Sequence, residues 1–231
     1  MQDYDQNATV QILMASKLVF ELSKISTTFE NILELGSGTG VLTKQIAKEL
    51  NFSNYFANDL VEKSKHYVKK FIPNSTFFCG NALKIKPPKK GDLIISNAMF
   101  QWFPSLEKAI QTISSNLKTD GILAFSTFAP ENFKEITNLT GLSLKYLTEK
   151  EIEEVLKNQG FEILYIEQFY EELKFKTPLE LLAHMKKTGV NSLSEKTWTI
   201  AKVKDFCDKY SKKYPENKLT YSPIIIIAKK K

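Results

Sequence analysis

The chain has 231 residues, of which 42% are hydrophobic and 25% charged, as is typical of a globular domain with a full core. No apolar run approaches the roughly 20 residues of a membrane-spanning helix. The two cysteines and two histidines are too isolated to indicate a disulfide framework or a metal site. The formal net charge is +6, and every one of the 32 basic residues is lysine, which favours loose attraction to an acidic partner. Without a signal-peptide pattern at the N-terminus, we expect a cytoplasmic protein.

Helix and strand patterns alternate between residues 8 and 126. A helix is expected at 8–24. Strands are expected at 32–35, 55–57, 76–79, 92–96 and 122–126, and helices at 41–50, 61–71 and 106–117. The Leu93-Ile94-Ile95 run is typical of a strand buried on both faces. This alternation predicts an α/β fold with a doubly wound parallel sheet, whose ligand lies beyond the carboxyl ends of the strands.

The second half of the chain is less regular. Thr148 and Glu151 form a Thr-x-x-Glu capping box that predicts a helix at 148–158, and a strand at 161–169 follows. Two further helices are expected at 177–187 and 195–210. A run of isoleucines predicts a last strand at 224–228. We expect a single domain over residues 1–231.

A glycine-rich turn closes the first strand of the predicted sheet. Gly36, Gly38 and Gly40 let the backbone turn sharply and lie against a ligand without a Cβ in the way. A dinucleotide fingerprint, G-x-G-x-x-G, would need its third glycine where Val41 stands. Glu34 precedes the turn by two residues. The pattern favours a binding site for S-adenosylmethionine, which has no phosphate to hold, over an ordinary strand-to-helix turn that binds no ligand.

Two polar positions follow the next strands. Asp59 ends the second strand, where a carboxylate can accept hydrogen bonds from both ribose hydroxyls, although it can also cap the following helix. Asn81-Ala82 follows the third strand and suits contact with an adenine ring, although Gly80-Asn81 is also an ordinary turn.

The fourth strand leads into Ser96-Asn97-Ala98-Met99-Phe100-Gln101-Trp102, where the methyl acceptor should lie. Enzymes that methylate exocyclic amines of bases usually have Asn/Asp-Pro-Pro-aromatic at this place, and both prolines are absent here. We therefore expect no nucleic-acid substrate. Gln101 and Trp102 are candidates for the acceptor pocket, with packing at the start of a helix as the alternative.

The chain resembles the malonyl-[acyl-carrier protein] O-methyltransferases of biotin synthesis from Tyr4 nearly to its C-terminus. The segments that carry the resemblance are Tyr4-Asp5-Gln6-Asn7-Ala8 with Gln11, Glu34 to Gly40, Ser96-Asn97 with Gln101-Trp102, Phe125-Ser126-Thr127-Phe128, Lys187-Thr188-Gly189-Val190-Asn191, and Leu219-Thr220-Tyr221. It implies a Rossmann-like methyltransferase fold with a mostly parallel seven-stranded sheet and an antiparallel last strand. It also implies a helical insertion at about 177–215 that covers the active site.

The implied reaction moves a methyl group from S-adenosylmethionine to the free carboxylate of a malonyl thioester, leaving S-adenosylhomocysteine. A carboxylate is ionised at neutral pH and needs no general base, so we expect orienting residues instead. The predicted acceptor-site residues are Tyr4, Gln101 and Trp102, with Tyr221 as a weaker candidate. The predicted cofactor-binding residues are Gln11, Glu34, Gly36, Ser37, Gly38, Gly40, Asp59, Leu60, Asn81, Ala82, Asn97 and Ala98.

The implied partner is an acyl carrier protein, which is acidic as a class, and we expect the enzyme to act as a monomer away from membranes. Lysines on the late helices could attract the carrier: Lys174, Lys176, Lys186, Lys187, Lys202, Lys204, Lys212 and Lys213. Two alternatives stay open. One is a carboxyl methyltransferase for a free small di- or tricarboxylic acid, and the other is a non-catalytic cofactor-binding partner protein.

Overall fold

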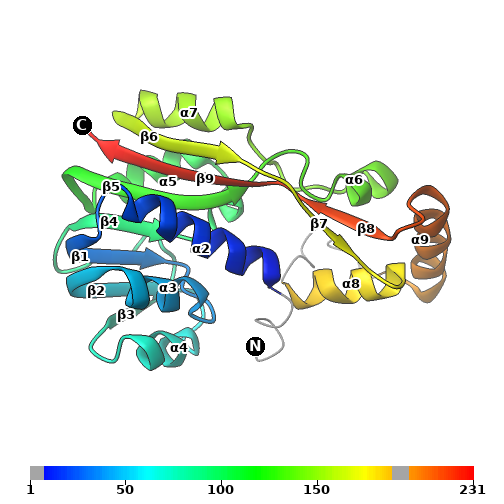
Figure 1. The fold of residues 1–231 in the computed structure, drawn as a ribbon, viewed down its shortest axis with the longest axis horizontal. Coiled ribbons are helices and arrows are strands. Elements are labelled where there is room, and N and C mark those ends of the chain that lie inside the picture. The colour runs from blue at the N-terminus through cyan, green and yellow to red at the C-terminus, as the bar shows by residue number, and fades with distance from the viewer. Residues whose placement is uncertain (1–7, 189–197) are drawn as a thin grey trace.

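A seven-stranded sheet forms the centre of the molecule, with helices on both faces (Figure 1). The computed structural model describes residues 8–188 and 198–231. The strand order is β3-β2-β1-β4-β5-β9-β6. The strands are β1 (Thr28–Leu35), β2 (Asn51–Asp59), β3 (Thr76–Cys79), β4 (Gly91–Ser96), β5 (Leu117–Phe128), β6 (Phe161–Gln168) and β9 (Pro223–Lys230). β1 to β5 pair in parallel, and β9 runs antiparallel between β5 and β6. The predicted doubly wound sheet with an antiparallel last strand is confirmed.

Five of the predicted helices begin within one residue of the expected position. The helices are α2 (Thr9–Ser23), α3 (Val41–Glu49), α4 (Ser64–Phe71), α5 (Leu106–Ser114), α6 (Lys134–Thr140), α7 (Glu149–Asn158), α8 (Pro178–Lys187) and α9 (Ile200–Lys213), with a 3₁₀ turn η1 (Phe100–Trp102). The predicted capping box of α7 is confirmed. The Thr148 hydroxyl accepts from the Glu151 N–H, and the Glu151 carboxylate accepts from the Thr148 N–H at 2.8 Å.

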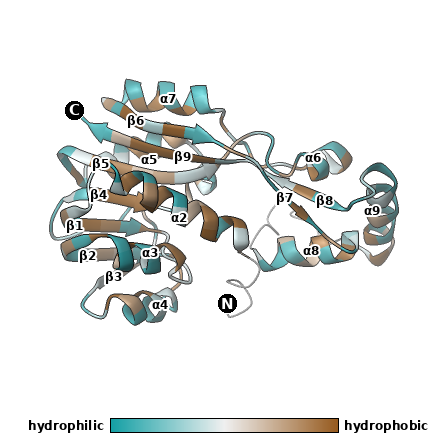
Figure 2. Ribbon diagram, in the orientation of Figure 1, coloured by the Kyte–Doolittle hydropathy of each residue, from teal (hydrophilic) through white to brown (hydrophobic). Residues whose placement is uncertain are grey.

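The core lies on both faces of the sheet because successive side chains of the central strands point to opposite sides. In β4, Leu93 and Ile95 join the apolar cluster that contains α2, whereas Ile94 joins the cluster that contains α5 and α7. The isoleucines of β9 divide in the same way. Figure 2 shows the resulting concentration of hydrophobic residues in the central strands. The expectation that β4 is buried on both faces is confirmed.

A second, two-stranded antiparallel sheet pairs β7 (Glu171–Lys174) with β8 (Lys218–Tyr221). Sequence analysis predicted neither strand, nor α6. β7 alternates between exposed and half-buried residues over four positions, so it has too weak a pattern to be recognised alone. Its partner lies more than forty residues later in the chain. Only this distant pairing makes it a strand.

Several element boundaries differ from the expected ones. The predicted helix at 106–117 ends at Ser114, and Leu117 already belongs to β5. The strand expected at 122–126 begins earlier, at Leu117, and it contains Asp120 with a left-handed φ of 61°. α4 begins at Ser64 rather than at residue 61. The start of the helix predicted at 195–210 lies outside the described residues.

The α8–α9 region lies with the small sheet beyond the carboxyl ends of the parallel strands (Figure 1). Leu181 and Met185 of α8 and Phe206 and Tyr210 of α9 belong to the same apolar cluster as α2. Within residues 8–188 and 198–231, no helix has both the length and the apolar character needed to cross a membrane.

Candidate active site

The glycine turn after β1 has the backbone conformation that glycine tolerates best. Gly36, Gly38 and Gly40 have φ values of +70°, +52° and +80°. A Cβ on Gly36 would lie 2.7 Å from Cγ of Met99, whereas a Cβ on Gly38 would meet nothing within 4 Å. The turn therefore packs closely against the chain that follows β4, and it presents an open backbone surface at Gly38.

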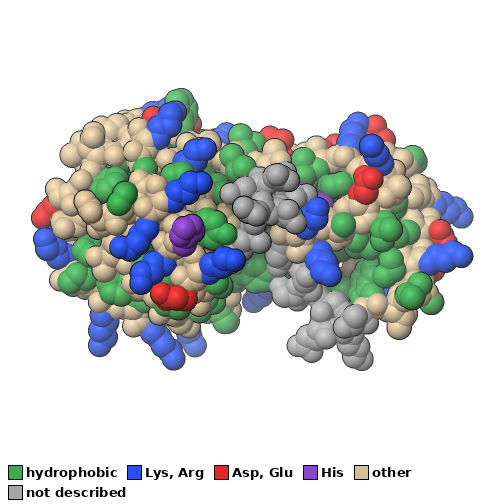
Figure 3. All heavy atoms as spheres, turned by 90° about the horizontal axis from the view of Figure 1, so that it is seen from below, with side chains coloured by type: hydrophobic (Ala, Val, Ile, Leu, Met, Phe, Trp, Pro, Cys, Tyr) green, Lys and Arg blue, Asp and Glu red, His purple; other side chains and the backbone are tan. Residues whose placement is uncertain are grey.

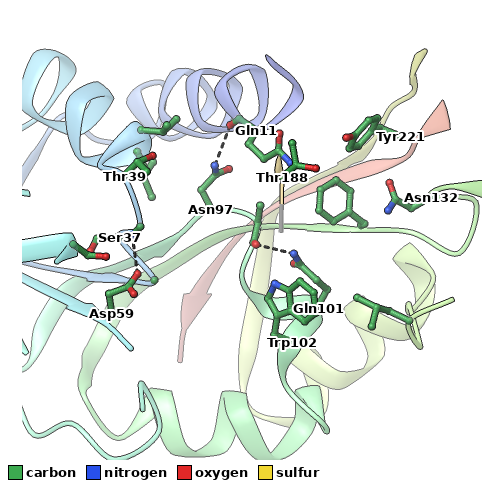
Figure 4. A pocket seen from close by; sticks show the side chains of 18 of the residues that line it. Gln11, Ser37, Thr39, Asp59, Asn97, Gln101, Trp102, Asn132, Thr188 and Tyr221 are labelled. Carbon is green, nitrogen blue, oxygen red and sulfur yellow. Dashed lines mark hydrogen bonds between the residues drawn. The ribbon is translucent and has the colours of Figure 1, made fainter. Parts of the chain in front are cut away.

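A cavity of about 460 Å³ lies beside this turn, and we call it the reaction cavity. Figure 4 shows Ser37 and Asp59 at one end, Asn132 and Tyr221 at the other, and Gln101 and Trp102 between them. Its described lining residues are Gln11, Gly36, Ser37, Gly38, Thr39, Val41, Leu42, Asp59, Val61, Ser64, Asn97, Ala98, Gln101, Trp102, Phe128, Asn132, Phe133, Leu144, Tyr146, Thr188 and Tyr221.

Asn97 joins the end of β4 to α2. Its Nδ2 donates to the backbone oxygen of Gln11 at 3.0 Å. Ser126 of β5 donates through Oγ to Asn97 Oδ1 at 2.6 Å and accepts from the Ala98 N–H at 2.9 Å. These bonds hold Ala98 at φ 50°, a conformation that costs an L-residue about 1–2 kcal/mol. Ser126 is fully buried, and sequence analysis assigned it no role.

Asp59 supports the glycine turn and the start of α4 together. One carboxylate oxygen accepts from the Gly38 N–H at 2.7 Å, and the other accepts from the Val61 N–H at 2.9 Å. Asp59 is also the only carboxylate among the described residues that line the reaction cavity. Each carboxylate oxygen keeps a further lone pair for a hydroxyl donor, so the capping and ligand roles are compatible.

Glu34 lies under the glycine turn and does not reach the cavity lining. Its Oε2 accepts from the hydroxyls of Thr43 at 2.7 Å and Tyr55 at 2.5 Å, while Oε1 has no partner among the described residues. The pKa of Glu34 is raised to about 7, mainly by burial and in smaller part by the nearby charge of Asp59, against the lowering effect of the two hydroxyls.

Gln101 and Trp102 reach the cavity from η1. Gln101 donates through Nε2 to the Ala98 oxygen at 2.7 Å, which fixes the side chain over the loop that carries Asn97. Trp102 is 44% exposed and lines the reaction cavity. Its indole is therefore accessible to a ligand.

Besides Glu34, four predicted site residues lie outside the cavity lining, and one lies outside the described residues. Gly40 is the N-cap of α3 beside the turn, and Leu60 is 73% exposed. Asn81 is exposed and accepts from the Leu83 N–H at 2.8 Å, which is the turn geometry that the sequence left as an alternative, and Ala82 follows it. Tyr4 lies outside the described residues.

Several residues at the far end of the cavity have partners that sequence analysis did not identify. Nε2 of His184 lies 2.7 Å from the hydroxyl of Tyr221, and burial lowers the pKa of His184, which favours the neutral ring. Asn132 donates to the Tyr146 hydroxyl at 3.0 Å, and burial raises the pKa of Tyr146 to about 12. In the amino-acid sequence, this end of the site was indicated only by two segments of the family resemblance, Lys187-Thr188-Gly189 and Leu219-Thr220-Tyr221.

The cavity wall carries buried polar atoms without partners among the described residues. They are Gln11 Oε1, Ser37 Oγ, Ser64 Oγ and Gln101 Oε1. Because buried polar groups are normally hydrogen-bonded, their convergence on one cavity indicates a polar ligand. With the bare backbone at Gly38 and one carboxylate, these donors and acceptors fit a nucleoside with an amino-acid tail.

The described cavity lining contains no histidine, lysine or cysteine. Within residues 8–188 and 198–231, no cluster of three or more His, Cys, Asp or Glu side chains is arranged to hold a metal ion. The groups available at this site can orient and desolvate a substrate, but they offer no strong base for its activation.

Comparisons with known proteins identify the family. Residues 8–166 match the family described as Methyltransferase domain. The chain is 38% identical to the malonyl-[acyl-carrier protein] O-methyltransferase of Calditerrivibrio nitroreducens, covering 98% of this chain and 91% of that protein. It is 35% identical to the protein of that name from Bacteroides thetaiotaomicron, covering 99% and 93%. A solved structure from Bacillus halodurans shares the fold, with a TM-score of 0.67 at 15% identity over 92% of this chain and 98% of that one. The chain therefore belongs to the methyltransferase-domain proteins and, among them, to the malonyl-[acyl-carrier protein] O-methyltransferase family.

Proposed function

We propose that the protein transfers a methyl group from S-adenosylmethionine to the free carboxylate of a malonyl thioester carried by an acyl carrier protein. Family membership supports this proposal, and so does the chemistry of the reaction cavity. The main supporting observation is a cavity with unpartnered polar groups and no basic catalyst in its described lining. A carboxylate acceptor has a reference pKa near 4, so it is already ionised and needs no base to activate it.

The cofactor would occupy the end of the cavity at the glycine turn. S-adenosylmethionine supplies an electrophilic methyl group on a positively charged sulfur. We assign Asp59 to the ribose hydroxyls, because it is the only carboxylate among the described lining residues. Gln11, Ser37 and Asn97 would contact the amino-acid tail.

The acceptor would occupy the end of the cavity at Gln101 and Tyr221. Neutral donors such as hydroxyl and amide groups can orient a carboxylate without pairing its charge, so the attacking oxygen stays nucleophilic. We assign Gln101 and Trp102 to this orientation, with Tyr146 as a further donor to the same volume, which Tyr221 also lines. Tyr4 stays a prediction.

The α8–α9 region is proposed as an insertion, at about 177–215, that covers the active site within a single domain over residues 1–231. Thr188, directly after α8, lines the reaction cavity. The apolar cluster shared by α2, α8 and α9 supports one continuous core. A monomer in the cytoplasm stays our expectation.

The carrier protein would approach a surface rich in lysine. All eight lysines predicted on or near the late helices are exposed. Figure 3 shows basic side chains on both halves of the face it presents, so exposure alone selects no docking surface.

A labelled-methyl assay tests the proposal. It compares malonyl-carrier protein, malonyl-coenzyme A, free malonate and a free tricarboxylate as acceptors. Methylation of a malonyl thioester in preference to the free acids is the expected result. Turnover on a free acid alone would support the small-acid alternative, and cofactor binding without turnover on any acceptor would support the non-catalytic one.

A further inference from the structure

A second cavity, also of about 460 Å³, lies directly beside the reaction cavity. It opens between the start of α5 and α7, under the segment 141–147, which has no regular secondary structure. The residues that line both cavities are Gln101, Trp102, Phe128, Leu144 and Tyr146. The two cavities therefore share a wall at the place where we locate the acceptor.

The lining of the second cavity combines apolar side chains with two charged ones, Glu107 and Lys145. Phe100, Phe103, Leu147, Ile152 and Val155 make most of it apolar. Lys145 and Glu107 are exposed at its edge, and Lys145 is the only basic residue among the described residues that line either cavity. An apolar passage with a cation at its edge suits a long, mostly uncharged chain that ends in an anion.

The proposed substrate has this composition. A carrier protein is far too large for a cavity of this size, so the malonyl group must reach the cofactor on its flexible arm. That arm has a thioester and amides near the acyl group and a phosphodiester next to the carrier. The exposed indole of Trp102 stands at the shared wall, where the thioester would pass from one cavity to the other.

We propose, on the basis of the proposed function, that the second cavity binds the phosphopantetheine arm of the carrier, with Lys145 beside its phosphate. The carrier then docks over the α5–α7 side of the molecule. The late-helix lysines on α8 and α9 do not contact it directly. Trp102 has two contacts in this arrangement, the carboxylate on one side and the thioester on the other.

The test compares a variant that obstructs the cavity with one that does not. Val155→Trp places a large side chain into the second cavity, and Glu154→Trp places the same side chain on the exposed face of the same helix. Substrates are malonyl-carrier protein and malonyl-N-acetylcysteamine, which lacks most of the arm. For Val155→Trp we expect about a tenfold loss of kcat/KM on the carrier-linked substrate, less than about a twofold change on the short thioester, and unchanged binding of S-adenosylhomocysteine.

A charge reversal gives an independent test that does not depend on packing. Lys145→Glu should raise KM for malonyl-carrier protein about tenfold and leave the short thioester unaffected, whereas the matched Lys70→Glu on the exposed surface of α4 should change neither. If the unaltered enzyme methylates neither thioester, the proposed function fails. If it methylates both, and Val155→Trp and Lys145→Glu match their controls on the carrier-linked substrate, the route through the second cavity is wrong and the proposed function stands.

Discussion

Replacing Asp59 by alanine removes the only carboxylate in the described lining of the reaction cavity. The change has two separable consequences. The N–H groups of Gly38 and Val61 lose their acceptor, which should lower the free energy of unfolding by about 1–2 kcal/mol. The cofactor should lose the acceptor of its ribose hydroxyls.

The loss of cofactor affinity can be estimated from the number of hydrogen bonds. A hydrogen bond to a charged acceptor contributes about 1.5–3 kcal/mol, so two at the lower value contribute about 3 kcal/mol. This corresponds to roughly a 100-fold increase in Kd. Titration calorimetry with S-adenosylhomocysteine measures it directly, and thermal unfolding without ligand measures the structural cost.

Asp92 provides a matched control at the opposite end of the sheet. Its carboxylate also accepts two backbone N–H bonds, from Glu30 at 2.7 Å and Asn31 at 2.6 Å, but it does not line the cavity. Asp92→Ala should therefore lose similar stability and keep the Kd of the unaltered protein. If Asp59→Ala binds S-adenosylhomocysteine as tightly as Asp92→Ala does, the assignment of Asp59 to the ribose is wrong.

Three further predictions concern the glycine turn and the acceptor site. The pKa of Glu34 is raised from 4.5 to about 7 in the folded protein. Its protonation therefore contributes roughly 3 kcal/mol to the free energy of unfolding below pH 4.5, and this contribution is lost as the pH rises to 7. Glu34→Gln should abolish this loss of stability with rising pH, as measured by urea unfolding. An unchanged pH dependence of stability would mean that Glu34 is not the group responsible. Gly36→Ala should lower Tm more than Gly38→Ala. Both changes add about 1 kcal/mol of left-handed strain, but only the new Cβ at position 36 would collide with Met99. Equal Tm values for the two variants would contradict the close packing of Gly36 against Met99. Gln101→Leu should lower kcat at least about tenfold while the Kd for S-adenosylhomocysteine changes less than about threefold, and the reverse order would move the acceptor elsewhere.

Much of the fold could be predicted because its signals are local. The apolar runs of β4 and β9 are long enough to identify buried strands without any knowledge of their neighbours. The glycines at Gly36 and Gly38 predicted a turn because their conformations are costly for other residues. The Thr148 capping box is likewise complete within four residues.

The rest depends on residues that are distant in the chain. Nothing local distinguishes Ser126 from other strand serines. Its role depends on the neighbouring strand β4, which brings Asn97 Oδ1 to 2.6 Å from Ser126 Oγ. β7 becomes a strand only when β8 pairs with it, and Tyr221 acquires a buried partner only when α8 brings His184 to it. No local pattern specifies these contacts, because each arises from the way in which separate elements pack.

The strand-and-helix alternation and the glycine turn could be read from the amino-acid sequence, because propensity, periodicity and motif spacing are properties of short segments. The family could be recognised from the resemblance of a few such segments. Three features required the folded chain: which polar groups share one cavity, that Glu34 lies beneath it rather than in it, and that a second cavity adjoins the first at Trp102. A cavity is the space left between packed elements, so its shape depends on contacts between residues far apart in the chain.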